Sequence, residues 1–179
     1  MAVENVTVAI SVRPHVGADN VALAHLFEEM QRHYRVPCPP FETILADLAA
    51  LPAGVEILVA ETDGIIGFAV CATIYPGPGL RSGFFLKELF VSQAHRGSGA
   101  GRLLMQALAH TAVQRGHGRV DWTADGENER LLAFYDGLGG TRQPEKVFFR
   151  LSGEALAALA NDEPFLLPVH GEKVSRSDG

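Results

Sequence analysis

The sequence FFLKELFVSQAHRGSGAGRLL, residues 84–104, joins an apolar run of aromatic and β-branched residues to a turn that holds an arginine and three glycines. A helical pattern follows the turn directly, so we expect a strand, a glycine loop and a helix in succession. Backbone N–H groups at a helix start are unpaired and partly positive, and they can bind a phosphate. Glycine suits such a loop because a Cβ atom would keep the anion away or forbid the backbone conformation.

Two common phosphate-binding loops fit the segment Arg96–Gly101 (RGSGAG) poorly. A nucleotide triphosphatase loop requires G-x-x-x-x-G-K-[ST], which the chain lacks. A dinucleotide-binding fingerprint requires G-x-G-x-x-G in the first βαβ unit and an acidic residue about 20 positions later. The glycines here are spaced two apart, in a unit that lies in the middle of the chain. The cluster alone is equally compatible with a tight strand-to-helix turn.

Length and composition are those of an ordinary globular chain, with 179 residues, 47% of them apolar and 20% charged. The formal charge of −6 argues against nucleic-acid binding and weakly favours cationic substrates. We expect a cytoplasmic protein without a membrane partner, because no apolar run approaches a membrane span and the N-terminus does not resemble a signal peptide. Cys38 and Cys71 show no metal spacing, and no metal site is expected.

Hydrophobic periodicity predicts the elements on either side of the opening stretch. Before it we expect a strand at 6–12, helices at 19–34 and 41–51, and a hairpin of strands at 55–61 and 65–75 with its turn at 62–64. After it we expect a helix at 101–115, a strand at 119–124, a helix at 128–138, a strand at 146–151 and a short helix at 154–160. The strands that begin at Phe84 and Arg119 should run parallel, as in a βαβ unit.

These elements predict an α/β fold with a mixed, mostly antiparallel central sheet of six to seven strands, a βαβ core and flanking helices. No internal repeat, low-complexity tract or linker interrupts the chain. We therefore expect a single domain at 1–160, followed by a C-terminal tail at 161–179.

Two motifs at a matching separation resemble the GCN5-related N-acetyltransferase family. The family's acetyl-CoA loop, R/Q-x-x-G-x-G/A, is matched by Arg96, Gly99 and Gly101, after the strand residues Leu89, Phe90 and Val91. Its downstream segment, N-x-x-x-x-x-x-Y-x-x-L-G, is matched by Asn128, Tyr135 and Leu138-Gly139. The resemblance covers residues 5–151. The sequence departs from the family pattern at Gln93, where proline is common, and at Gly140, where an aromatic residue is common.

The resemblance implies an acetyl-CoA-dependent N-acetyltransferase that releases coenzyme A. The diphosphate would lie on the loop formed by Arg96, Gly97, Ser98, Gly99, Ala100 and Gly101, where Arg96 adds a positive charge. Pantetheine would fill a gap between two splayed strands and pair with the backbone of Leu89, Phe90 and Val91, where an N–H would also polarise the thioester carbonyl. Asn128 would bond pantetheine or phosphate from the helix face that it shares with Tyr135.

Tyr135 and Glu88 are the candidate catalytic residues. By resemblance, Tyr135 lies near the sulfur, and a tyrosine of pKa about 10 can protonate a departing thiolate of pKa about 8.5; the alternative is a core aromatic with a satisfied hydroxyl. Glu88 interrupts an apolar strand, where an unpaired charge is costly, so it should line a cavity or pair with a neighbour such as Lys87. A carboxylate there resembles the amine ligand or base of polyamine and diamine acetyltransferases, which the segments KELFV and NERLLAFY look like.

The acceptor expected from this resemblance is a small primary amine, such as a polyamine, a diamine or a thialysine-like amino acid. Protein N-termini or lysines are an alternative, and so is a non-catalytic acyl-CoA sensor. Glu28, Glu29, His33 and Tyr34 end the first helix where the family's acceptor pocket is often walled, although a solvated helix end explains the glutamates equally well. The resemblance also implies a homodimer.

Overall fold

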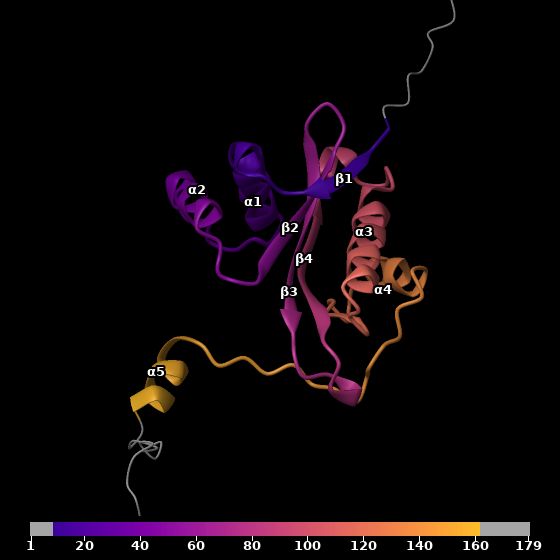
Figure 1. Ribbon diagram of the computed structural model, residues 1–179. Helices are drawn as coiled ribbons and strands as arrows, with labels where there is room; N and C mark the ends of the chain where they lie inside the picture. The colour runs from indigo at the N-terminus through magenta and orange to yellow at the C-terminus, as the bar shows by residue number, and fades with distance from the viewer. Residues whose placement is uncertain (1–8, 162–179) are drawn as a thin grey trace, which may run out of the picture. The chain divides into compact units, whose positions relative to one another are not determined.

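A five-stranded sheet with helices on both faces forms the first of the chain's two units, Met1–Gly139 (Figure 1). The computed structural model describes residues 9–161. The strands are β1 Ser11–Pro14, β2 Val55–Glu61, β3 Ile65–Ile74, β4 Gly83–Val91 and β5 Val120–Trp122. They keep this order across the sheet, and all neighbours are antiparallel except β4 and β5, which run parallel.

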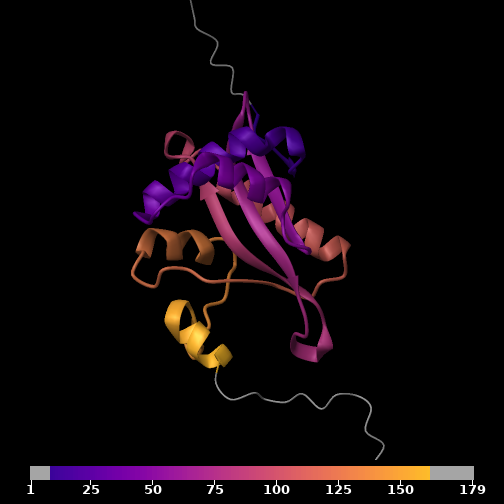
Figure 2. The same ribbon diagram turned by 90° about the vertical axis from the view of Figure 1, so that its left-hand side faces the viewer.

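The helices of this unit divide between the two faces of the sheet (Figures 1 and 2). One face carries α1 Asn20–Tyr34 and α2 Phe41–Ala49, and the other carries α3 Ala100–Gln114, with α4 Glu129–Asp136 beside it. Short 3-10 turns lie at Gly17–Asp19, Pro78–Leu80 and Gln93–His95. Each face has its own apolar core, because the strands alternate their side chains between the faces.

The predicted α/β class, the hairpin and the parallel βαβ unit are confirmed. The β2–β3 turn is closed by a hydrogen bond from the Thr62 N–H to the Gly64 carbonyl at 3.0 Å. The helix predicted at 101–115 is α3, and it connects β4 to the parallel β5. The first predicted strand, at 6–12, falls partly outside the described residues, and β1 continues to Pro14.

One count is corrected: the described residues form a sheet of five strands instead of six to seven, because the segment at 146–151 is not a strand. Phe148 and Phe149 are adjacent and both exposed, so neither face of the segment is buried as one face of a strand would be. In the second unit, Gly140–Gly179, the regular element of the described part is α5 Gly153–Asn161. Most of the expected tail lies outside the described residues, and the predicted boundary of the domain at residue 160 stays a prediction.

An ion-pair network joins β1, β2 and the start of α1. The Arg13 guanidinium bonds both carboxylate oxygens of Asp19, at 2.7 and 2.9 Å, and Oε2 of Glu61 at 2.7 Å. The hydrogen bonds from Arg13 hold the pKa of the buried Asp19 at about 2, below its usual value of 3.8. The helix predicted from residue 19 begins at Asn20, and the side chain of Asp19 before it does not cap the helix, because Arg13 and the Val16 N–H engage it.

Candidate active site

A bulge in β4 at Lys87 changes the face that the following side chains present. Leu86 and Glu88 pair with consecutive residues of β3, so Lys87 is the extra residue in the register. Before the bulge, Leu86 packs in the core on the α3 side of the sheet. After it, Phe90 packs with α1 and α2. Since side chains alternate along a strand, Glu88 shares the α1 side with Phe90.

β4 and β5 pair only over their first residues. The parallel ladder joins Phe84–Leu86 to Val120–Trp122. Beyond it, the β4 edge at 87–91 that faces away from β3 pairs with no strand in the described part of the chain. The two strands thus separate, as the resemblance implied. Unpaired N–H and C=O groups on this edge can bind an extended ligand as an added strand would.

The loop after β4 presents backbone N–H groups at the start of α3. Gly97 and Gly99 have φ values of +83° and +93°, a region that glycine adopts at little cost. A Cβ atom on either would meet nothing within 4 Å, so internal packing does not explain these glycines. The N–H groups of Gly97, Gly99 and Gly101 donate to no backbone acceptor among residues 9–161. The loop is therefore open to an anion, and the helix dipole of α3 favours one.

Arg96 directs its side chain to the α1 side of β4. Its Cζ lies 5.6 Å from the centre of the Phe90 ring, and its Nε donates to the Val91 carbonyl at 3.3 Å. The predicted contact between this guanidinium and a cofactor phosphate stays a prediction. Ser98, another residue of the predicted loop, accepts the Ala100 N–H at 3.4 Å through its hydroxyl.

Glu88 lies near two tyrosines. Tyr34, the last residue of α1, donates its hydroxyl to Oε1 of Glu88 at 2.6 Å. Burial and then this hydrogen bond raise the pKa of Tyr34. Burial and then the charge of Glu88 raise the pKa of Tyr135. Glu88 forms no ion pair with any described residue, so the alternative interpretation, an ion pair between Glu88 and Lys87, is wrong.

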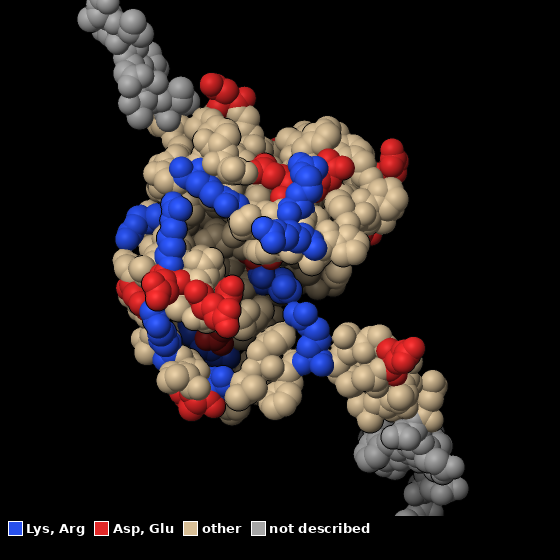
Figure 3. All heavy atoms as spheres, turned by 180° about the vertical axis from the view of Figure 1, so that it is seen from behind, with Lys and Arg blue, Asp and Glu red and all other residues tan. Residues whose placement is uncertain are grey.

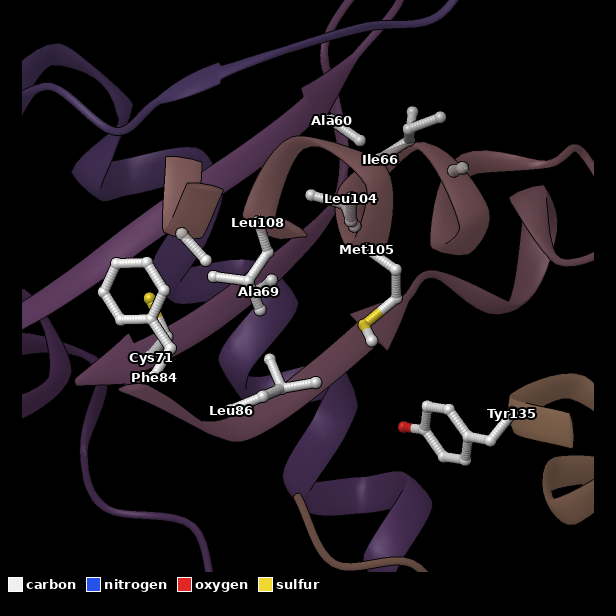
Figure 4. Close-up of a cluster of buried hydrophobic side chains, with 12 residues drawn as sticks. Ala60, Ile66, Ala69, Cys71, Phe84, Leu86, Leu104, Met105, Leu108 and Tyr135 are labelled. Carbon is white, nitrogen blue, oxygen red and sulfur yellow. The ribbon is translucent and has the colours of Figure 1, made fainter. Parts of the chain in front are cut away.

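Tyr135 is buried beside the point where β4 and β5 separate. It is 9% exposed, and its ring centre lies 5.2 Å from that of Trp122, the last residue of β5. Figure 4 shows the ring projecting from α4 with its hydroxyl toward Leu86 of β4. A tyrosine hydroxyl is protonated at neutral pH even at its ordinary pKa of 10, and burial raises the pKa of Tyr135 further, so the hydroxyl is available as a proton or hydrogen-bond donor.

Asn128 is the N-cap of α4. Its Oδ1 accepts the Leu131 N–H at 3.0 Å, which satisfies one of the unpaired donors of the helix start. The sequence predicted that Asn128 lies within the helix, two turns before Tyr135, but the helix begins at Glu129. The predicted bond to pantetheine or phosphate stays a prediction, and the side-chain NH₂ group is the part of Asn128 left to make it.

Sequence reasoning missed two features of this site. It treated Tyr34 as part of a pocket wall and not as the partner of Glu88, which lies 54 residues away along the chain. It did not consider Arg32, which lines a hollow with Glu29 and His33. Helical spacing was the available signal, because residues at i, i+3 and i+4 share one face of a helix.

The chain matches the model of the acetyltransferase (GNAT) family over residues 16–139, and it belongs to this family. The resemblance found in the sequence is therefore confirmed. The matched span includes the glycine loop, Glu88 and Tyr135. The family consists of acetyltransferases that act on amines, which is the class of enzyme predicted from the sequence.

The chain is similar to several known proteins. An L-ornithine N5-acetyltransferase of Arabidopsis thaliana is 34% identical over 95 residues, which are 53% of this chain and 42% of that protein, so the match spans less than half of the relative. An integron cassette protein from the mobile metagenome of V. cholerae is 29% identical, with a TM-score of 0.77, over 85% of this chain and 98% of that one. An aminoglycoside acetyltransferase from an uncultured soil sample, 17% identical with a TM-score of 0.67 over 80% of this chain and 95% of that one, shows the fold alone.

The site fits the acyl donor of the family, acetyl-CoA. The open glycine loop suits a diphosphate, and the free edge of β4 suits the extended pantetheine arm with its amide groups.

In the described chain, no group of three or more His, Cys, Asp or Glu side chains is arranged to hold a metal ion. Every helix among residues 9–161 is too short or too polar to cross a membrane. On the face seen in Figure 3, basic and acidic side chains are interspersed.

Proposed function

We propose that this chain is an acetyl-CoA-dependent N-acetyltransferase that transfers acetyl directly to a primary amine of a small molecule, such as a polyamine, a diamine or an amino acid. One observation carries the proposal: Glu88, held by Tyr34, lies on the strand whose far end continues into the open glycine loop. A carboxylate for an amine and an anion-binding loop for a donor thus come from one strand and the turn that follows it. The relative named for ornithine N5-acetylation supports an amine acceptor.

On the donor side, the loop at 96–101 would hold the diphosphate through its backbone N–H groups. The β4 edge at Leu89–Val91 would pair with pantetheine, and acetyl-CoA supplies an activated thioester carbonyl when bound. A backbone N–H near Leu89 or Phe90 would donate to the carbonyl oxygen as negative charge develops on it. Such a fixed donor lowers the barrier without any reorganisation during the reaction.

On the acceptor side, Glu88 would bind the amine in its protonated form. An alkyl amine has a pKa near 10.4 and must lose a proton before it can attack a carbonyl. The carboxylate of Glu88 would attract the ammonium and pass the proton to water. The hydrogen bond from Tyr34 fixes Oε1 of the carboxylate and leaves Oε2 for the amine.

Tyr135 would complete the transfer as the acid. As the amine nitrogen forms its bond to the carbonyl carbon, the carbon–sulfur bond breaks and the sulfur needs a proton. The Tyr135 hydroxyl, which is protonated at neutral pH, would donate to the departing sulfur and recover its proton from solvent. The bound ammonium loses one proton through Glu88 to water before attack and a second as the amide forms, while the thiol gains one, so the transfer balances with the net release of one proton to solvent.

A thiol-release assay with acetyl-CoA and a panel of amines tests the proposal, with mass spectrometry of the amine product. We expect release of one thiol for each acetylated small amine. Acetylation of peptide N-termini or lysines alone would show that the acceptor is a protein and not a small molecule. Binding of acetyl-CoA without thiol release for any amine would contradict an enzyme and favour a sensor. A cytoplasmic location and a homodimer remain predictions from composition and resemblance.

A further inference from the structure

A cationic hollow lies on the α1 side of the sheet, at the C-terminal end of α1. It encloses about 180 Å³ and is lined by Glu29, Arg32, His33, Gln93 and Arg96. The proposed transfer assigns no role to Glu29, Arg32, His33 or Gln93, whereas the resemblance gives the fifth residue of the lining, Arg96, a place in the cofactor loop. The hollow therefore requires a separate account.

Two guanidinium groups in the hollow lack a carboxylate partner. The side chain of Arg32 forms no hydrogen bond or ion pair with any described residue. Arg96 bonds a backbone carbonyl and stacks over Phe90, which leaves its terminal nitrogens unpaired among the same residues. Glu29 is the single carboxylate of the lining, and its Oε1 already accepts the Gln93 N–H at 2.6 Å. The hollow thus carries an excess of positive charge in a chain whose formal charge is −6.

The hollow adjoins the proposed amine site. The His33 ring centre lies 5.3 Å from that of Tyr34, whose hydroxyl holds Glu88. His33 also lies 6.1 Å from Phe90, ring centre to ring centre, and the Arg96 guanidinium covers the same ring. Phe90 follows Glu88 by two positions on one face of β4, a spacing of about 7 Å along a strand. An amino acid with an amine at the end of its side chain has a similar reach.

We infer that this hollow binds the carboxylate of the acceptor, and that the acceptor is an amino acid acetylated on its side-chain amine. The inference rests on the proposed function and narrows it. Arg32 and Arg96 would form charge-assisted hydrogen bonds with the carboxylate, while Glu88 binds the distal ammonium. Polyamines and simple diamines carry no carboxylate and would leave both guanidinium groups without a ligand.

Pairs of acceptors that differ only in the carboxylate test the inference: L-ornithine against putrescine, and L-lysine against cadaverine. We expect kcat/KM for each amino acid to exceed that of its decarboxylated partner at least about tenfold, because a charge-assisted pair is worth a factor of this order. Ornithine methyl ester keeps the shape and removes the charge, and it should behave as putrescine does. Equal or higher kcat/KM for the diamines would overturn the inference while leaving the transferase intact.

Arg32→Gln then tests the hollow, with Arg35→Gln as the matched control. Both changes remove a cation from the end of α1, where cations also favour the helix dipole, but Arg35 does not line the hollow. We expect Arg32→Gln to raise KM for ornithine about 10- to 100-fold and to leave KM for putrescine and acetyl-CoA nearly unchanged, and Arg35→Gln to change none of them. An increase in KM for acetyl-CoA instead would assign the hollow to the donor and overturn the inference. Absence of thiol release with every amine would overturn the proposed function and this inference with it.

Discussion

The hydroxyl of Tyr34 lies 2.6 Å from Oε1 of Glu88, and this hydrogen bond ties the end of α1 to the middle of β4. Tyr34 is about half exposed, so the bond sits at the surface of the site and not in the core. It orients a carboxylate that has no ion-pair partner among the described residues. The geometry of the amine site therefore depends on a contact between two elements far apart in the sequence.

Replacing Tyr34 by phenylalanine removes that hydrogen bond and keeps the ring. We expect kcat/KM for the amine to fall about tenfold, because a hydrogen bond to a charged group is lost, while KM for acetyl-CoA stays the same. Steady-state kinetics with both substrates varied measures the effect. Tyr75→Phe, at an exposed tyrosine of the β3–β4 loop, is the control and should match the wild type. An unaltered amine kcat/KM in Tyr34→Phe would show that the bond does not position Glu88.

Tyr135→Phe tests the acid. We expect kcat to fall about 100-fold with little change in either KM, because the ring still packs against Trp122 while the donor to sulfur is lost. The raised pKa of Tyr135 adds a pH signature: in the wild type, ionisation of this tyrosine should not reduce the rate below pH 10, its ordinary pKa. Unchanged turnover of the variant across this pH range would remove Tyr135 from the acid role. A thermal melt near that of the wild type would show that the loss is not one of folding.

The glycine loop is tested by Gly99→Ala against Gly54→Ala. Both glycines have positive φ values, +93° and +83°, and an added Cβ would meet nothing within 4 Å at either. Each change should therefore cost about 1 kcal/mol of folding free energy through backbone strain alone. Only Gly99 belongs to the proposed diphosphate site, so we expect a KM for acetyl-CoA about tenfold higher in Gly99→Ala and unchanged in Gly54→Ala. Equal KM values in the two variants would contradict the assignment of the loop.

The Arg13–Asp19 pair predicts how stability depends on acid. The pKa of Asp19 is lowered to about 2 in the fold, so the pair stabilises the protein above pH 3.8 and this contribution disappears as the pH falls through 2. We expect Asp19→Asn to cost about 1 to 2 kcal/mol at neutral pH and to flatten the acid limb of the stability curve. Denaturant unfolding between pH 2 and 7 measures this, with Asp63→Asn in the exposed β2–β3 turn as control. A parallel loss at pH 2 and pH 7 would mean that the ion pair is not the cause.

Local patterns were sufficient to predict the fold class and most of its elements. The Asp63-Gly64 turn predicted the hairpin, and the glycines after β4 predicted the start of α3, because both depend on residues close in sequence. The strand predicted at 146–151 was wrong, and local sequence explains this error too. Its apolar residues suit a strand, but a strand also needs a partner, and local sequence does not specify one.

The candidate site was predictable in its motifs and not in its long-range contacts. Arg96, Gly99 and Tyr135 were singled out by the family motifs that the sequence resembles, whereas the partner of Glu88 depends on how α1 packs against β4. Asn128 shows the same limit: its position was found, but the structure uses its oxygen to cap α4. The bulge at Lys87, which sets the face of Glu88, leaves no signal in a single sequence.

The central claim is that acetyl passes directly to an amine bound at Glu88. It is tested most directly by the pH dependence of coenzyme A thiol release in the wild type and in Glu88→Gln, with the preferred amine. We expect the variant to lose most of its rate at neutral pH and to recover as the pH approaches that of the free amine, about 10.4, where the substrate needs no base. Full activity of Glu88→Gln below pH 8, or no amine-dependent thiol release by the wild type at any pH, would contradict the claim.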